Sequence, residues 1–272
     1  MTADAPVTPA HSRPLRSCVH AILFWIATMA VLVAVSGTTH ALPWVLQAVV
    51  NGAVGSAAAY ALSFWFCRRD GLSMADARLT PDRKSLPLLA FGLIAGALLA
   101  SAFALLLWCF GIVTYRFAAT PAPAALGLSM LGFVLLALRE EIVFRGYPLR
   151  TLETGLGRGP ALALMATLFT VEHLLGGYSI LNAVVGSVLS ALVFGMAAIA
   201  SRSLAFPLGL HAAWNMIDWA SGGKGGVGIL ERAGEATRGN QLAGLSVYAG
   251  IMGIALLVLW QAERRRTRSA AS

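Results

Sequence analysis

The sequence predicts an all-α fold, a polytopic membrane bundle of about eight transmembrane helices. Three observations carry this prediction: 58% of the 272 residues are hydrophobic, only 12% are charged, and the mean hydropathy is +0.74. A soluble domain of this size does not need so much apolar surface, and apolar runs recur along the whole chain. At these run lengths only helices can satisfy their own backbone hydrogen bonds in lipid.

Each apolar run is near the ~20 residues that a bilayer core requires, although the fifth and seventh runs are short. We expect one membrane-embedded domain at 19–262, between a disordered cytoplasmic N-terminus at 1–18 and a basic cytoplasmic tail at 263–272. The expected spans are 19–36, 43–66, 87–111, a fourth that begins near Ala122, 160–175, 181–200, 203–220 and 243–261.

The placement of lysine and arginine predicts the orientation of these spans. With the N-terminus inside, the outer segments hold only Arg116, Lys224, Arg232 and Arg238, and the other 16 of the 20 basic residues are cytoplasmic. This agrees with the positive-inside rule and puts both termini in the cytoplasm. The net charge of +8 is therefore explained by topology, without a nucleic acid as partner. The short loops favour a bacterial inner membrane as the location.

Two further features bear on the chain's organisation. The first apolar run has an alternative interpretation as a signal peptide cleaved near Thr39-His40-Ala41. The glycine-rich segment 221–242 is expected to be a flexible outer loop. The three cysteines, which lie in or beside the spans without metal-binding spacing, imply no disulfide framework: Cys18, Cys67 and Cys109.

A charged block at 139–150 directly follows an apolar run without charges. A carboxylate at a membrane helix centre costs about 2.5–3.5 kcal/mol on translocon scales, so such groups are expected to be paired, hydrated or functional. Arg145 lies four residues after Glu141, the favourable order for an intrahelical ion pair. Glu140 points about 100° away from Glu141 and is left to face another partner. The alternative is that the block is simply the charged cytoplasmic end of a membrane helix.

Two later spans carry polar residues at helical spacing. Phe169 and His173 are four residues apart and share one helix face. His211, Asn215 and Asp218 form a polar stripe on an otherwise apolar helix. The alternative for both is packing by interhelical hydrogen bonds, worth about 0.6 kcal/mol each on average.

The turn between the fourth and fifth spans predicts which of these residues meet. If the turn centres on Gly157, Glu140 lies 17 residues before it and His173 lies 16 residues after it. In an antiparallel pair of helices the acid and the imidazole would then face each other at the same height. This expectation assumes one helix from Ala122 to Thr154, about 50 Å long, which protrudes beyond the membrane core. His211 reaches the same level only with that protrusion.

Together these blocks resemble the CPBP intramembrane protease family ("Abi" family), which includes type II CAAX prenyl endopeptidases and bacteriocin-immunity-like membrane proteins. The resemblance covers roughly residues 122–220, and the three spans before it match only in number and hydrophobicity. Glu172 and Asp218 are not part of the family pattern. The matching residues are Glu140-Glu141-x-x-x-Arg145, Phe169-x-x-x-His173 and His211-x-x-x-Asn215.

The resemblance implies intramembrane hydrolysis of a peptide bond in a membrane-associated peptide or protein, which in the family's eukaryotic members is prenylated. Glu140 and His173 would hold and deprotonate a water, while His211 and Asn215 would stabilise the oxyanion. Glu141, Arg145 and Phe169 would support these catalytic residues.

The family has been called metalloprotease, and Glu140, His173 and His211 are candidate ligands for zinc. The His-Glu-x-x-His spacing of zincins is absent, however, which favours a metal-free water activated by glutamate.

Two functions of other classes remain alternatives. The same fold could serve a non-catalytic binding or bacteriocin-immunity protein, which would not depend on Glu140. A small proton-coupled transporter would also use glutamate and histidine inside the membrane. The oligomeric state is left open by the sequence.

Overall fold

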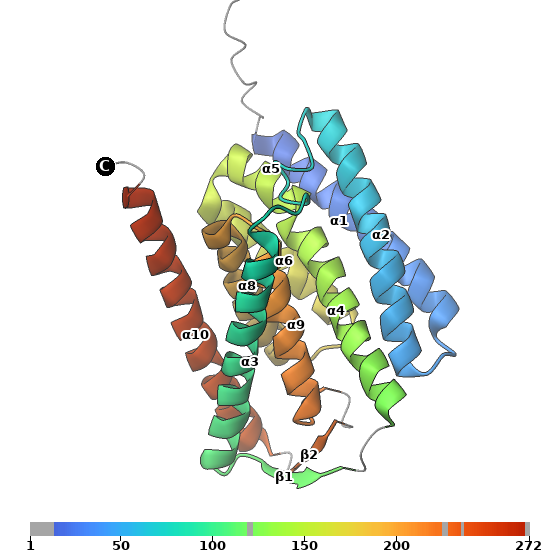
Figure 1. The fold of residues 1–272 in the computed structure, drawn as a ribbon, viewed down its shortest axis with the longest axis vertical. Helices are drawn as coiled ribbons and strands as arrows, with labels where there is room; N and C mark the ends of the chain where they lie inside the picture. Colours follow the sequence, from blue (N-terminus) through green and yellow to red (C-terminus); the bar gives the residue numbers. More distant parts are fainter. Residues whose placement is uncertain (1–13, 119–121, 225–227, 235–236, 270–272) are drawn as a thin grey trace, which may run out of the picture.

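The structure, a computed structural model, describes residues 14–118, 122–224, 228–234 and 237–269. It is a bundle of helices with one small two-stranded sheet at one end (Figure 1). The predicted all-α helical bundle is therefore confirmed as the fold class.

The helices and strands follow one another with short connections. The first helix begins at Pro14 rather than near residue 19, and the last extends to Ser269 rather than ending near residue 261. Between Ile180 and Ser201 the helix is continuous but contains one π-helical turn. The elements are α1 Pro14–Thr39, α2 Trp44–Asp70, α3 Ser85–Cys109, β1 Thr114–Phe117, α4 Pro123–Arg145, α5 Tyr147–Leu156, α6 Arg158–Leu175, α7 Ile180–Asn182, η1 Ala183–Ser187, α8 Val188–Ser201, α9 Ala205–Ala220, β2 Leu230–Ala233 and α10 Arg238–Ser269.

Within the described chain, five helices are long and apolar enough to cross a membrane: α1, α2, α3, the continuous 180–201 helix and α10. The predicted count of eight is not confirmed. The helices α4, α6 and α9 are either shorter or carry charged and polar residues that lower their hydropathy. In α10 only 11% of the most apolar stretch is buried, as expected for a helix that faces lipid.

The predicted single helix from Ala122 to Thr154 is wrong. The chain leaves the helical conformation at Gly146, where ψ is −128°, and α5 restarts with a proline in its first turn. Because proline lacks a backbone N–H, Pro148 cannot continue the hydrogen-bond ladder of α4. The helix α4 is therefore about 35 Å long, and the single helix of about 50 Å on which the height argument depended is replaced by two shorter helices, α4 and α5.

A further difference is an antiparallel pairing of two short strands, distant in the sequence, in segments expected to be loops. Strands β1 and β2 are antiparallel, with Thr114 opposite Ala233 and Phe117 opposite Leu230. The expectation of a flexible loop at 221–242 is therefore wrong for β2 and for the start of α10, while residues 225–227 and 235–236 lie outside the described residues. Arg232 of β2 fastens the sheet to α9 through Asp218, at 2.7 Å.

Small residues let the central helices approach one another closely. A Cβ added to Gly92 or Gly96 of α3 would collide with the α9 backbone, and one added to Gly209 of α9 would collide with α3. Such small-residue contacts are the usual means of close helix packing in membranes. In this way α9 packs between α3 and α4, and α4 packs between α9 and α2 (Figure 1).

Candidate active site

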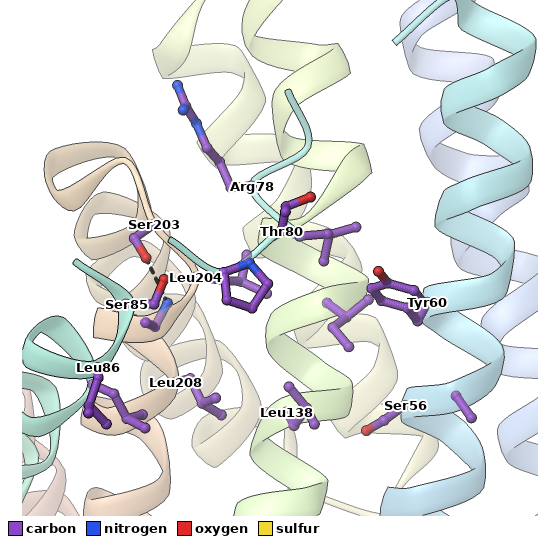
Figure 2. A pocket seen from close by; sticks show the side chains of 16 residues that line it. Ser56, Tyr60, Arg78, Thr80, Ser85, Leu86, Leu138, Ser203, Leu204 and Leu208 are labelled. Atoms are coloured by element: carbon purple, nitrogen blue, oxygen red, sulfur yellow. Dashed lines mark hydrogen bonds between the residues drawn. The ribbon is translucent and has the colours of Figure 1, made fainter. Parts of the chain in front are cut away.

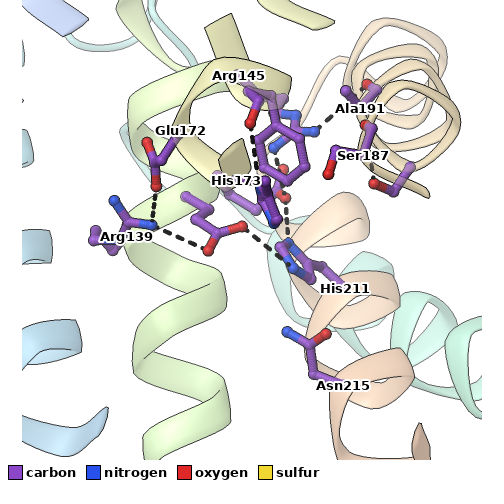
Figure 3. A network of polar contacts seen from close by, with 12 residues as sticks. Arg139, Arg145, Glu172, His173, Ser187, Ala191, His211 and Asn215 are labelled. Carbon is purple, nitrogen blue, oxygen red and sulfur yellow. Dashed lines mark hydrogen bonds and ion pairs between the residues drawn. The ribbon is translucent and has the colours of Figure 1, made fainter. Parts of the chain in front are cut away.

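A buried polar cluster lies where α4, α6 and α9 meet, inside an otherwise apolar bundle (Figure 3). Six of its members are at most 7% exposed, so the cluster must satisfy its charges internally. Its members are Arg139, Glu140, Glu141 and Arg145 of α4, Glu172 and His173 of α6, and His211 and Asn215 of α9.

Glu141 is fully buried and contacts two basic partners. Its Oε1 accepts a hydrogen bond from Arg145 Nη1 at 3.3 Å, so the predicted ion pair is present. The same oxygen lies 2.8 Å from Nδ1 of His211. Because an ionised carboxylate can only accept, Nδ1 carries the proton in this contact. Glu141 therefore orients His211 so that Nε2 faces the opposite way.

Arg145 is held in place by aromatic rings as well as by Glu141. Its guanidinium lies over the ring of Phe169, 4.9 Å from the centroid, and 5.5 Å from that of Phe194. Phe194 in turn stacks on the imidazole of His211, with 4.4 Å between centroids. The ring of Phe169 thus packs against a buried cation, a favourable contact for both groups.

Glu140 lies on the other side of His211. Its Oε2 is 3.6 Å from His211 Nε2, too long for a direct hydrogen bond. Its Oε1 accepts a hydrogen bond from Arg139 Nη2 at 3.0 Å. The side chain is 16% exposed, more than its neighbour Glu141.

His173 is oriented by the residue one turn before it. Its Nδ1 lies 2.9 Å from the backbone carbonyl oxygen of Phe169, which can only accept. The proton is therefore on Nδ1, and Nε2 keeps its lone pair. The ring packs between Phe169 and Tyr178, with centroid distances of 4.4 and 5.0 Å. The helix α6 brings His173 to the cluster (Figure 3), so the long hairpin is not needed to place the imidazole there.

Asn215 lies one turn beyond His211 on α9 and receives a contact that sequence reasoning missed. Lys224 Nζ donates to Asn215 Oδ1 at 2.6 Å. With its oxygen engaged, the amide offers Nδ2 as a donor in another direction. Asp218, the third member of the predicted stripe, pairs instead with Arg232 and serves the sheet.

Arg139 and Glu172 also belong to the cluster and were not predicted as site residues. Arg139 Nη2 contacts Glu140 at 3.0 Å and Glu172 at 2.5 Å. The available signal was the presence of a charged residue directly before each of Glu140 and His173. Sequence reasoning counted Arg139 among the cytoplasmic basic residues that orient the chain, and it placed Glu172 outside the family pattern.

The candidate zinc ligands do not fit a metal in this arrangement. Among the residues that the structure describes, no three His, Cys, Asp or Glu side chains are grouped so that they could hold a metal ion. We therefore derive no step through zinc. Cys18, Cys67 and Cys109 are free thiols in the structure.

A separate apolar cavity of about 700 Å³ lies on another side of α4 (Figure 2). Leu138 and Ile142 of α4 line it, together with residues of α2, α3, α9 and the segment at 78–81. Two residues along a helix correspond to about 200° of rotation, so Glu140 points away from this cavity. The polar cluster and the cavity are therefore distinct.

Comparison with known proteins identifies a family over part of the chain. Residues 121–217 match a family model described as Rce1-like, type II CAAX prenyl endopeptidase Rce1-like. The predicted resemblance is thereby confirmed over this segment, which contains Glu140, His173, His211 and Asn215. No curated protein matches the chain in a direct comparison.

Proposed function

We propose that this chain is an intramembrane endopeptidase of the CAAX type, which hydrolyses a peptide bond in a membrane-associated peptide or protein. The observation that carries the proposal is the 3.6 Å approach of Glu140 Oε2 to His211 Nε2, inside the segment that matches the Rce1-like family. Four of the five apolar helices lie outside that segment and would hold it in the bilayer. We further propose a bacterial inner membrane, with both termini in the cytoplasm.

In the proposed mechanism, Glu140 and the free Nε2 of His173 hold a water molecule. Glu140 removes one proton as the water oxygen attacks the scissile carbonyl carbon. The proton then passes from Glu140 to the leaving amine as the C–N bond breaks. No serine or cysteine belongs to the polar cluster defined above, which favours an attacking water over a side-chain nucleophile.

The oxyanion would form beside α9. His211 would donate from Nε2 while Nδ1 remains bound to Glu141. Asn215 would donate from Nδ2, the end of the amide that Lys224 leaves open. Such donors are worth about 2.7–4 kcal/mol each in soluble proteases.

The test compares the wild type with Glu140→Gln and His173→Ala on quenched peptides, with and without farnesylated CAAX-like C-termini. Loss of a general base should lower kcat by about 10²- to 10⁴-fold. Glu231→Gln, a change at an exposed position of β2, is the control and should remain active. A folded wild type that cleaves none of these peptides, nor co-expressed membrane proteins, would contradict the proposal.

The same samples test the metal. We expect full activity in the presence of chelators and no stoichiometric zinc by elemental analysis. Zinc that is bound at one ion per chain and lost in His173→Ala would overturn the metal-free mechanism.

A further inference from the structure

We infer that Arg139 and Glu172 act as a positioning pair, which turns one oxygen of Glu140 toward the water and holds α6 against α4. The inference rests on the proposed function, and it concerns two residues that lie outside the family pattern given above. Neither residue is placed to touch the substrate. Both act through Glu140 and His173.

The hydrogen bonds of Arg139 determine how Glu140 is oriented. One terminal nitrogen, Nη2, donates to Glu140 Oε1 at 3.0 Å and to Glu172 Oε1 at 2.5 Å. This nitrogen carries two hydrogens, so it can serve both carboxylates at once. With Oε1 engaged, Oε2 is the oxygen that faces His211. Figure 3 shows Arg139 beside Glu172, on the side of the cluster away from Asn215.

The pair also joins the two helices that carry the proposed water-activating residues. Arg139 directly precedes Glu140 on α4, and Glu172 directly precedes His173 on α6. The contact between Arg139 and Glu172 therefore sets the distance between Glu140 and His173. Proximity of this kind matters because small displacements of catalytic groups cause large losses of rate.

Packing leaves Arg139 little freedom to move. Only 5% of its surface is exposed, and 7% of that of Glu172. On the α2 side, a Cβ added to Gly55 would lie 2.8 Å from Arg139 Cδ, so the stem of the arginine occupies the space that this glycine leaves. The stem of Arg139 therefore packs against α2, while its guanidinium is held by the carboxylates of Glu140 and Glu172.

The charge balance of the polar cluster also supports a role for the pair of Arg139 and Glu172. Three carboxylates, those of Glu140, Glu141 and Glu172, are accompanied by two guanidinium groups. Without Arg139, Glu140 and Glu172 would be two buried carboxylates without their shared cation. A buried ion pair is weak evidence for stability by itself, which makes an organising role for this one the better explanation.

The test is a double-mutant cycle with Arg139→Gln, Glu172→Gln and both changes together, assayed on a farnesylated CAAX-like peptide. We expect Arg139→Gln to lower kcat at least tenfold with KM changed less than about threefold. Glu172→Gln should cause a smaller loss of kcat. The double variant should lose less than the product of the two single effects, because Glu172→Gln removes one of the two carboxylates that Arg139→Gln leaves without their shared cation.

A second pair in the chain provides a matched control. Arg150 and Glu153 of α5 also form a 2.5 Å ion pair, and Arg150 also bonds a backbone carbonyl, that of Ala198. The variants Arg150→Gln and Glu153→Gln should alter thermal stability without changing kcat of the folded enzyme. Arg139→Lys, which keeps a cation that can reach both carboxylates, should recover part of the lost kcat.

The possible outcomes separate this inference from the proposed function. A normal kcat in folded Arg139→Gln or Glu172→Gln, with an active wild type, overturns the inference alone. An equal loss of kcat in the α5 control variants also overturns it, since the effect would then be general destabilisation. An inactive wild type overturns the proposed function and the inference together. If Arg139→Gln does not fold, Glu172→Gln, which removes one charge and keeps an acceptor, decides between these results.

Discussion

Nδ1 of His211 lies 2.8 Å from Oε1 of Glu141, although the two residues are 70 positions apart and belong to α9 and α4. Because of this contact, the adjacent residues Glu140 and Glu141 have different roles. Glu141 is completely buried, neutralised by Arg145 and used to orient an imidazole. Glu140 is left on the far side of that imidazole, where it is more exposed.

The Glu141→Gln variant should be strongly destabilised. The change leaves Arg145 as a buried cation without its carboxylate, and breaking such a pair costs about 3–5 kcal/mol. The unfolding midpoint in detergent should fall accordingly, while Glu231→Gln on the exposed side of β2 should unfold like the wild type. An unchanged midpoint would show that Arg145 is satisfied by its carbonyl and aromatic contacts alone.

The Asn215→Ala variant should lose about 10²- to 10³-fold in kcat if its amide stabilises the oxyanion. Lys224→Met should lose less, roughly tenfold or about 1.4 kcal/mol, because it only releases the orientation of the amide. The chain's other lysine, Lys84, lies at the start of α3 and provides the control Lys84→Met. Equal activity of the two lysine variants would exclude a positioning role for Lys224.

The Gly96→Ala variant tests whether close packing of α3 places the site. Its new methyl group would meet the backbone of Leu210, the residue directly before His211. Overpacking of this kind costs about 1–3 kcal/mol, and the shift of α9 should lower kcat as well as the unfolding midpoint. Gly253→Ala on α10, where no atom lies within 4 Å of the added methyl, is the control and should change neither quantity. Full activity in Gly96→Ala would mean that α9 can shift without displacing His211.

The Tyr147→Phe variant should be less stable without a change in mechanism. Tyr147 is buried and its hydroxyl donates to Asp70 at 2.5 Å, a charged hydrogen bond worth about 1.5–3 kcal/mol. Arg16 and His20 of α1 also contact Asp70, so the contacts of this one carboxylate join α1, α2 and α5. Tyr60→Phe, at a residue that is 46% exposed, should be neutral. A Tyr147→Phe protein as stable as wild type would contradict this account.

The same tyrosine predicts a pH dependence. Burial, followed by the hydrogen bond to Asp70, raises the pKa of Tyr147 above its ordinary value. The unfolded chain then releases the phenol proton near pH 10, before the folded protein does. This contribution to stability is complete below about pH 10 and is lost as the pH rises through the folded-state pKa. Unfolding midpoints between pH 8 and pH 11 should therefore fall more steeply in wild type than in Tyr147→Phe, and parallel curves would contradict the prediction.

The local features of this protein were determined by the sequence alone. Hydropathy over single helices predicted the helical bundle because burial of the backbone in lipid is a property of each segment. The ion pair of Glu141 with Arg145 followed from a spacing of four residues, and so did the shared face of Phe169 and His173. These relationships depend on helix geometry within one element and need no knowledge of the rest of the chain.

The relationships between helices were decided by the tertiary structure. The break at Gly146 replaced the expected long helix, yet packing of α9 against α4 still brought His211 within 3.6 Å of Glu140. Sequence reasoning could not predict the hydrogen bond from Lys224 to Asn215, because it depends on how the chain turns back after the end of α9. It also could not pair Arg139 with Glu172, because these residues lie on different helices and meet only when α4 and α6 come together in the fold.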